Sequence, residues 1–332
     1  MTIREMLEER EREYLSPKAS LSCDASREVD EEECDMRTAF QRDRDRILHS
    51  NSFRRLKRKT QVFLSPESDH YRTRLTHTLE VSQIARSMAR ALNLNEDLAE
   101  AGALGHDLGH TPFGHAGERA LREVCPFGFN HFEQSARVVT TLEKNGRGLN
   151  LTKQTIDAIG HHSGDILPST LEGQVVRLAD KIAYANHDID DAIRGGVLQN
   201  GDVPFEIAEV LGANSRTRLN TMIRAVVEES RGKDCIEMEK TVKNAHAELL
   251  RFMFDNVYIN SVAKLEEGKA EEIVKKLYLH FEKHPEQMPD MYQLIIERDG
   301  VSRAACDYIA GMTDNYAVAK FSELYLPTFW MK

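Results

Sequence analysis

Apolar residues recur at intervals of three and four along most of the chain, and this spacing predicts α-helices. Within residues 76–92, apolar residues recur with helical periodicity at Leu79, Ile84, Met88 and Leu92, with Val81 and Ala85 alongside. Asn95 can then accept hydrogen bonds from the first free N–H groups of a following helix. Similar patterns predict helices over residues 96–108, 114–124, 131–145, 152–159 and 171–193.

The C-terminal third continues the helical pattern but carries no motif that indicates chemistry. Helix-like stretches cover residues 203–211, 214–230, 239–259, 261–281, 289–298 and 302–325. The sequence has no internal repeat and no strand-rich block. It also lacks the GxGxxG and GxxxxGK[ST] signatures of sheet-based nucleotide folds. An all-α fold is therefore predicted.

Changes in residue pattern divide the chain into three parts. Residues 1–36 are highly charged, with a short helix at the start, and are expected to form an N-terminal arm or linker. Residues 37–200 hold nearly all the candidate chemistry and are expected to form the core. Residues 201–332 are expected to form a helical extension packed on that core.

Composition and charge narrow the class of protein. The chain has 332 residues, of which 41% are hydrophobic and 30% charged, which is typical of a globular protein. The net charge of −10 argues against broad binding to nucleic acids. Five cysteines without CxxC spacing indicate a reducing compartment, and we find no membrane span or signal peptide. A soluble cytoplasmic protein is expected.

One basic stretch departs from the acidic average. From Arg37 to Thr60 there are nine Lys or Arg residues and two Asp residues, with the densest run at Arg54 to Lys59. This run can form a wall that binds phosphate, because guanidinium and ammonium groups pair well with phosphate oxygens. A solvated helix face is the alternative interpretation.

Two histidines and two aspartates are the strongest candidates for a metal site. They are His77, the adjacent pair His106 and Asp107, and Asp180. His106 and Asp107 end an apolar helix where packing gives no reason for a polar pair, and Asp180 follows an apolar helical face. A buried carboxylate in such a place needs a cation or several hydrogen-bond donors. Imidazole nitrogen and carboxylate oxygen are suitable ligands for Mn, Fe or Mg.

Further histidines follow the His-Asp pair. His115 and Glu118 are three residues apart at the start of a predicted helix, so the carboxylate can orient the imidazole for proton transfer; a surface or capping pair is the alternative. His110 can share the face of His106. His131 heads another helix and can meet a phosphate. His161 and His162, at a predicted helix end, are additional candidates to face the site.

The helix that follows Asp180 carries a polar stripe. Positions 180, 184 and 188 share one face, which places Tyr184 and Asp188 in line with Asp180, and Lys181 lies beside them. A phenol and a second acid on this stripe fit a wall that contacts a sugar and phosphates. An ordinary polar helix face is the alternative.

Seven longer stretches carry a resemblance to a known family. They are Arg44 to Ser50, Phe53 to Leu56, Lys59 to Phe63, Arg74 to His77, Gly105 to His115, Asn130 to Ser135 and Ala179 to Tyr184. With the metal set, they resemble the deoxyguanosine triphosphate triphosphohydrolases and their close relatives in the HD superfamily of metal-dependent phosphohydrolases. The resemblance covers residues 37–196. It implies an all-α HD-domain bundle and hydrolysis of a deoxynucleoside triphosphate to the deoxynucleoside and intact inorganic triphosphate.

The resemblance also implies a role for each candidate residue. His77, His106, Asp107 and Asp180 would hold a divalent metal, either Mn, Mg, Fe or Ni. His115 would act at the α-phosphate, Glu118 would orient His115, and His131 would support the phosphate. The substrate would also meet Gln61, Arg74, His110, Lys181, Tyr184 and Asp188.

The sequence also bears on partners and on other possible functions. The resemblance implies a homo-oligomer and a second nucleotide as an allosteric activator, and the basic run is compatible with weak binding to single-stranded nucleic acid. Two other functions compete with the triphosphohydrolase interpretation. The chain could hydrolyse another nucleotide phosphoester, or it could be a nucleotide sensor or single-strand binder with little activity.

Overall fold

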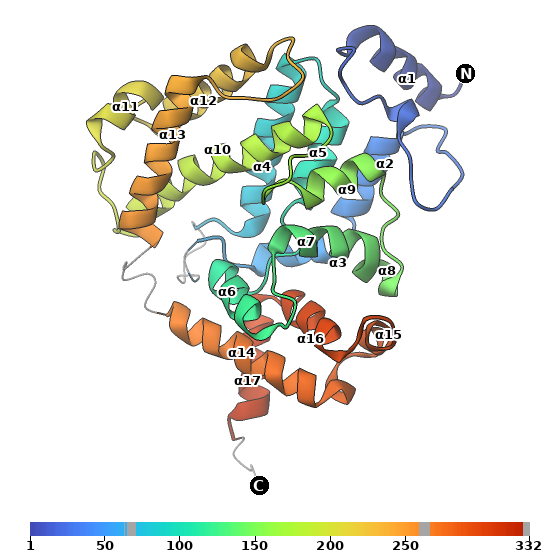
Figure 1. Cartoon of the computed structure of the whole chain (residues 1–332), viewed down its shortest axis with the longest axis vertical. Helices are drawn as coiled ribbons and strands as arrows, with labels where there is room; N and C mark the ends of the chain where they lie inside the picture. Colours follow the sequence, from blue (N-terminus) through green and yellow to red (C-terminus); the bar gives the residue numbers. More distant parts are fainter. Residues whose placement is uncertain (63, 65–70, 259–265, 328–332) are drawn as a thin grey trace.

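The computed structural model describes residues 1–62, 64, 71–258 and 266–327, and this part of the chain is almost wholly helical (Figure 1). The described residues form no β-strand and make only two isolated bridges, Arg27 with Thr152 and Thr60 with Thr73. The predicted all-α fold is confirmed. No helix in these ranges is long and apolar enough to cross a membrane.

The helices before residue 200 include each one that the sequence predicts in this part of the chain, together with α2, α3 and α8. Their bounds are α1 Ile3–Tyr14, α2 Ala39–Leu48, α3 Asn51–Arg55, α4 Arg74–Ala91, α5 Glu96–Gly105, α6 Gly114–Val124, α7 His131–Arg137, α8 Glu143–Gly146, α9 Lys153–Gly160 and α10 Leu171–Arg194. Asn95 caps α5 as predicted, because its side chain accepts from the backbone N–H groups of Asp97 and Leu98.

Two predicted helices end earlier than the sequence indicates. The helix expected over 96–108 ends at Gly105, where the chain turns towards α7. The helix expected over 131–145 breaks into α7, a π-helical turn at Val138–Leu142 and the short α8. Lys144 and Asn145 take left-handed backbone conformations, and Leu149 donates back to the Val139 carbonyl, so the chain reverses here.

Helix α5 lies at the centre of the first part of the fold and packs against α2, α4, α9 and α10. Gly102 makes the contact with α9 possible, because a Cβ there would lie 2.9 Å from the Ala158 Cβ. Buried apolar residues of α4, α5 and α10, including Ile84, Ala103 and Val176, form one continuous core with the helices that follow α10.

The C-terminal third covers two separate faces of this bundle (Figure 1). Helices α11 Phe205–Leu211, α12 Ser215–Ser230 and α13 Lys240–Met253, with the π-helical turn η4 Phe254–Tyr258, lie beside α10. Helices α14 Glu267–Lys283, α15 Asp290–Asp299, α16 Val301–Ala310 and α17 Asp314–Tyr325 lie at the other end, where α14 packs on α6. The single stretch predicted over 302–325 is therefore two helices, separated at residues 311–313.

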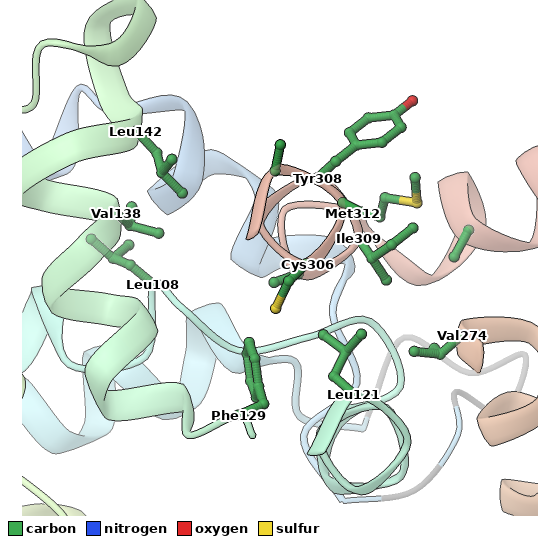
Figure 2. Close-up of a cluster of buried hydrophobic side chains, with 14 of the residues drawn as sticks. Leu108, Leu121, Phe129, Val138, Leu142, Val274, Cys306, Tyr308, Ile309 and Met312 are labelled. Atoms are coloured by element: carbon green, nitrogen blue, oxygen red, sulfur yellow. The ribbon is translucent and has the colours of Figure 1, made fainter. Parts of the chain in front are cut away.

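A second buried cluster joins α6 to these last helices. Figure 2 shows Leu121 of α6, Phe129, Val274 of α14 and both Cys306 and Ile309 of α16 in this cluster. The burial of these apolar side chains fixes α6, which begins at the loop after the His-Asp pair, against the C-terminal region.

The N-terminal segment lies against α2 and the start of α9. Arg27 forms a buried ion pair with Asp43, with Nη1 to Oδ1 at 2.5 Å, and Glu31 pairs with Arg46 at 2.6 Å. Through these ion pairs, the segment that contains residues 15–36 packs against α2. The boundaries at residues 36 and 200 stay predictions.

Candidate functional site

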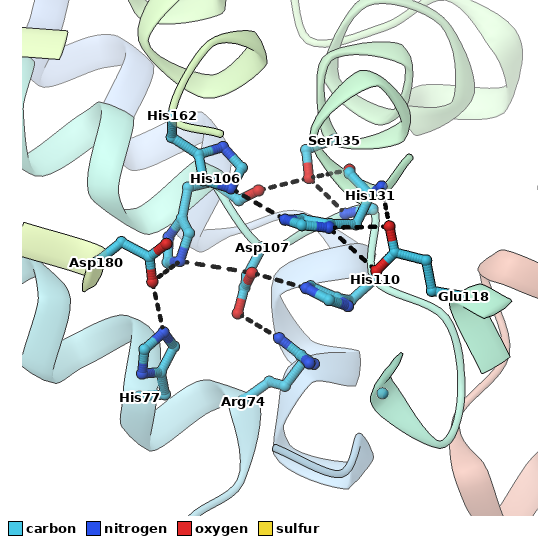
Figure 3. A network of polar contacts seen from close by, with 12 residues as sticks. Arg74, His77, His106, Asp107, His110, Glu118, His131, Ser135, His162 and Asp180 are labelled. Atoms are coloured by element: carbon cyan, nitrogen blue, oxygen red, sulfur yellow. Dashed lines mark hydrogen bonds and ion pairs between the residues drawn. The ribbon is translucent and has the colours of Figure 1, made fainter. Parts of the chain in front are cut away.

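The four predicted metal ligands converge from three helices (Figure 3). His77 lies on α4, Asp180 lies on α10, and His106 and Asp107 follow α5 directly. Asp180 Oδ1 is 3.1 Å from His77 Nε2 and 3.6 Å from His106 Nε2, and Asp107 Oδ1 is 3.5 Å from His106 Nε2. Ligand atoms of His77, His106 and Asp107 lie within 4.8 Å of one another, so they can bind a single metal ion.

The hydrogen bond made by His106 Nδ1 leaves the other ring nitrogen, Nε2, available to a metal. Its Nδ1 is 2.6 Å from the Ala103 carbonyl oxygen, which can only accept, so Nδ1 carries the proton. In the neutral ring, Nε2 then has a lone pair that points towards the two carboxylates. His106 Nε2 is buried and has no hydrogen-bond partner among the described residues. A cation at this point would satisfy it.

The electrostatics of this group also favour a cation. Burial lowers the pKa of His106, but Asp107 and Asp180 outweigh that effect and raise the pKa to about 9. Burial would raise the pKa of Asp107, but His106 and Arg74 hold it well below its usual range. Arg74, almost fully buried, donates to Asp107 Oδ2 at 2.8 Å and so fixes the orientation of that carboxylate.

A second group of titratable residues adjoins the metal group. His110 Nε2 is 3.3 Å from Asp107 Oδ1, and the His110 ring stacks on His131 with 4.1 Å between ring centroids. Glu118 of α6 contacts both His115 and His131. Its carboxylate oxygens lie 3.2 Å from His131 Nδ1 and 3.5 Å from His115 Nδ1. The structure therefore brings His115, Glu118 and His131 together at the start of α6 and α7.

The three side chains of this second group differ in charge and exposure. Burial would raise the pKa of Glu118, but hydrogen bonds from His115 and His131 outweigh it and hold the pKa well below its usual range. His115 has 47% of its side chain exposed, yet the protein packed around its ring lowers its pKa, against the opposing effect of Glu118. A partly exposed imidazole thus lies beside an ionised carboxylate.

His162 is a member of the site that the sequence indicated only as one of two candidates. Its Nδ1 donates to the Ile159 carbonyl at 2.7 Å, and its Nε2 is 3.3 Å from His131 Nε2. Burial lowers the pKa of His162 to about 3, so its neutral ring, whose Nδ1–H faces Ile159, offers Nε2 as an acceptor towards His131. His161 instead contacts Asp157 on its own helix, at 2.7 Å, and takes no part in this network.

Close backbone packing holds the loop after Asp107 against α7. The Gly109 N–H donates to Ser135 Oγ at 2.9 Å, and the same hydroxyl lies 2.5 Å from the His106 carbonyl. A Cβ on Gly109 would lie 2.2 Å from the Ser135 backbone nitrogen and 2.5 Å from the His131 carbonyl. Only glycine fits here, which explains the glycine after the His-Asp-Leu sequence.

This packing predicts a large difference between two Gly→Ala substitutions. Gly109→Ala must displace rigid backbone, so we expect the free energy of unfolding to fall by about 1–3 kcal/mol. Gly268→Ala, early in α14, meets no atom within 4 Å and should leave stability unchanged or slightly higher. Urea denaturation followed by circular dichroism measures both, and equal stabilities would contradict the packing described.

A cavity of about 490 Å³ opens beside the second group. His115 and His131 line one side of it. Tyr184 of α10 lines another side, together with Phe254 and Tyr258 of η4, and the Tyr184 and Tyr258 rings stack at 5.4 Å. The two residues of η4 come from the region where the sequence carried no motif, so they could not have been selected in advance.

The remaining predicted substrate residues occupy different environments. Gln61 is buried, and its Oε1 has no partner among the described residues. Asp188 is also buried, behind Tyr258, whose hydroxyl lies 2.5 Å from Asp188 Oδ2; burial raises the pKa of Asp188 to about 8 although this hydrogen bond opposes the shift. Lys181 is exposed on α10. Of the basic run, Lys57 and Arg58 are exposed, whereas Lys59 is buried.

Comparison with known proteins gives matches over the whole chain. The family described as HD domain matches residues 74–185, and the phosphohydrolase-associated domain matches residues 236–323. A deoxyguanosinetriphosphate triphosphohydrolase-like protein from Caldanaerobacter subterraneus subsp. tengcongensis is 55% identical over 333 residues, covering 100% of this chain and 98% of the relative. A protein of the same name from Clostridium perfringens is 49% identical over 341 residues, covering 100% of both chains.

A solved structure shares the fold. The crystal structure of a phosphohydrolase from Bacteroides thetaiotaomicron superimposes with a TM-score of 0.54 at 18% sequence identity, covering 84% of this chain and 67% of the other.

Proposed function

Because the chain belongs to the family of deoxyguanosinetriphosphate triphosphohydrolase-like proteins and is a phosphohydrolase of the HD type, we propose that it hydrolyses deoxynucleoside triphosphates. The products would be the deoxynucleoside and intact inorganic triphosphate. The observation that carries the proposal is the junction of the two groups of side chains. His110 lies between Asp107 of the metal group and His131 of the group that contains His115 and Glu118.

The metal part of the proposal rests on the donor set. His77, His106, Asp107 and Asp180 would hold a divalent ion such as Mn, Mg, Fe or Ni, because their nitrogen and oxygen atoms suit these ions and His106 Nε2 has no hydrogen-bond partner in the described part of the chain. Such an ion, when bound, activates water and polarises a phosphoryl group.

The chain's own residues account for the other requirements of the reaction. Water attacks the α-phosphorus, the bond from phosphorus to the 5′-oxygen breaks, and this oxygen needs a proton to leave as the deoxynucleoside. His115 can donate it, since its side chain is partly exposed and Glu118 contacts its Nδ1, which leaves Nε2 for the substrate. His131, held by Glu118 through Nδ1, would support a phosphate oxygen through Nε2, which would then exchange its contact with His162 for the phosphate.

The sugar would lie against Tyr184 in the adjacent cavity. Tyr184 lines that cavity with Tyr258, and the two stacked rings form a flat apolar wall with a phenol at its edge. Arg74 and Gln61 would approach the sugar and the α-phosphate. This role of Gln61 is supported by its buried Oε1, which has no hydrogen-bond partner among the described residues.

Product analysis tests the proposal. The purified protein would be incubated with each deoxynucleoside triphosphate, singly and in mixtures, with Mn or Mg, and the products separated by chromatography. Deoxynucleoside and intact triphosphate are the expected products. Turnover only in mixtures would indicate a second nucleotide as activator. Release of orthophosphate or pyrophosphate, or no turnover by metal-loaded protein, would contradict the proposal.

Removal of the metal should inactivate the protein and lower its melting temperature. Chelation leaves the carboxylates of Asp107 and Asp180 without their cation, and a ligand present at 100 times its Kd stabilises the folded state by about 2.7 kcal/mol. Thermal denaturation and turnover would be measured before chelation, after it and after metal is restored. Full turnover by protein whose metal content is zero by elemental analysis would contradict the metal assignment.

A further inference from the structure

Asp314, the first residue of α17, contacts two segments of the candidate site that are far from it in sequence. Its Oδ2 accepts from the backbone N–H and the hydroxyl of Thr60, at 2.9 Å and 2.6 Å. Its Oδ1 accepts from the backbone N–H of Phe113 at 2.9 Å. One carboxylate of the C-terminal region thus joins the segment before Gln61 to the loop before His115.

The contacts of Asp314 are not those of an ordinary helix cap. An aspartate in the first turn usually accepts hydrogen bonds from its own helix. In α17 that role belongs to Thr313, whose side chain accepts from the Tyr316 N–H at 3.3 Å. Both oxygens of Asp314 instead accept from the other two segments.

Lys59 makes a parallel connection. It is buried, and its Nζ donates to the carbonyl of His110 and, at 2.8 Å, to the carbonyl of Ala310 at the end of α16. The Lys59 carbonyl in turn accepts from the Arg74 N–H at 3.2 Å, where α4 begins. Lys59 therefore connects three segments through its side chain and its backbone carbonyl: the loop at His110, the start of α4 and the end of α16.

The loop that Asp314 and Lys59 contact has a backbone that needs such support. Phe113 takes a left-handed conformation with φ of 62°, which is unfavourable for a residue with a Cβ. Phe113 immediately precedes α6, and its side chain makes no capping hydrogen bond to that helix. The hydrogen bond from the Phe113 N–H to Asp314 fixes this conformation, and the next residues are Gly114 and His115.

We propose that Asp314 is a positioning residue, and that with Lys59 it sets the conformation of residues 109–115, which present His110 and His115 to the substrate. This inference rests on the proposed function. It assigns the C-terminal helices α16 and α17 a specific role in the reaction, in addition to the apolar packing of α16 against α6 seen in Figure 2. Asp314 itself contacts no predicted metal ligand.

Two matched substitutions separate positioning from stability. Asp314→Asn keeps the shape of the side chain but replaces one acceptor oxygen with an NH₂ group, facing backbone N–H groups that also donate. Asp299→Asn is the control, because Asp299 of α15 also joins the C-terminal helices to the core, through Arg137 of α7 at 2.5 Å, but away from the loop. Both should be assayed well below their melting temperatures.

We expect Asp314→Asn to lower kcat about 10- to 100-fold, in the range seen for residues that orient catalytic groups, with full metal content. KM should change much less, because the cavity wall formed by Tyr184 and Tyr258 is untouched. Asp299→Asn should keep the wild-type kcat. A wild-type kcat for Asp314→Asn, or an equal loss in both variants, would overturn the inference.

Hydrogen exchange measured by mass spectrometry gives a readout that does not need turnover. Peptides that cover residues 109–118 should exchange faster in Asp314→Asn than in the wild type and in Asp299→Asn. Unchanged exchange would overturn the inference even if the wild-type protein hydrolyses deoxynucleoside triphosphates. If Asp314→Asn exchanges faster but the wild-type protein does not hydrolyse deoxynucleoside triphosphates, the error lies in the proposed function and not in this inference.

Discussion

Asp107→Ala should remove the metal and lower kcat by about 10³-fold or more. Asp107 contacts both parts of the site, with Oδ1 at 3.5 Å from His106 Nε2 and 3.3 Å from His110 Nε2. A bound metal is worth several kcal/mol of transition-state stabilisation, and about 4 kcal/mol corresponds to this loss of rate. Metal content by elemental analysis and turnover under saturating substrate are the two measurements.

Asp191→Ala provides the control for loss of a buried aspartate. Asp191 also pairs with an arginine, Arg72, at 2.8 Å, and it lies on the same helix as Asp180. Its removal should lower stability while metal content stays at the wild-type level. Full metal occupancy in Asp107→Ala would contradict the ligand assignment, and loss of metal in Asp191→Ala would show that the effect is not specific.

His115→Ala should lower kcat by about 10²–10⁴-fold while the metal stays bound. The side chain is 47% exposed and contacts Glu118, so its removal creates no cavity in the core. The 5′-oxygen would then leave without its proton donor. The control is His280→Ala, because His280 of α14 contacts Gln287 at 2.9 Å and lies outside the site.

The pH dependence of kcat gives a second test of His115. A proton donor acts only while it is protonated, so kcat should fall as pH rises through the pKa of His115 in the complex. Burial lowers that pKa in the free protein, and the negative charge of a bound triphosphate would raise it again. This limb of the profile should be absent in the residual activity of His115→Ala. An unchanged kcat for His115→Ala would remove this residue from the mechanism.

The convergence of His77, His106, Asp107 and Asp180 was predictable because the residue types themselves limit the possibilities, and their role as metal ligands stays a prediction. A His-Asp pair at the end of an apolar helix and an aspartate on an apolar helical face both need a polar partner, and the fold places them together. The all-α fold was predictable for a similar reason, since the helical spacing of apolar residues is local. Helix ends were less predictable where tertiary contacts decide them, as at Gly105.

Residues that enter the site through tertiary packing could not be predicted in the same way. Tyr258 reaches the cavity because η4 lies beside α10, and nothing in its local sequence distinguishes it from other tyrosines. Asp314 looks like any acid in the first turn of a helix, and only the packing of α16 and α17 places it against Thr60 and Phe113. For His162, the sequence offered a pair of histidines, and the turn after α9 decides which one faces His131.

The most direct test of the central claim is the position of the bond that breaks. The metal-loaded protein would hydrolyse a deoxynucleoside triphosphate in water enriched in ¹⁸O, and both products would be identified by mass spectrometry. Attack of water at the α-phosphorus predicts an unlabelled deoxynucleoside and an intact triphosphate that carries one ¹⁸O atom. A deoxynucleoside monophosphate with pyrophosphate, a diphosphate with orthophosphate, or ¹⁸O in the deoxynucleoside would contradict the account.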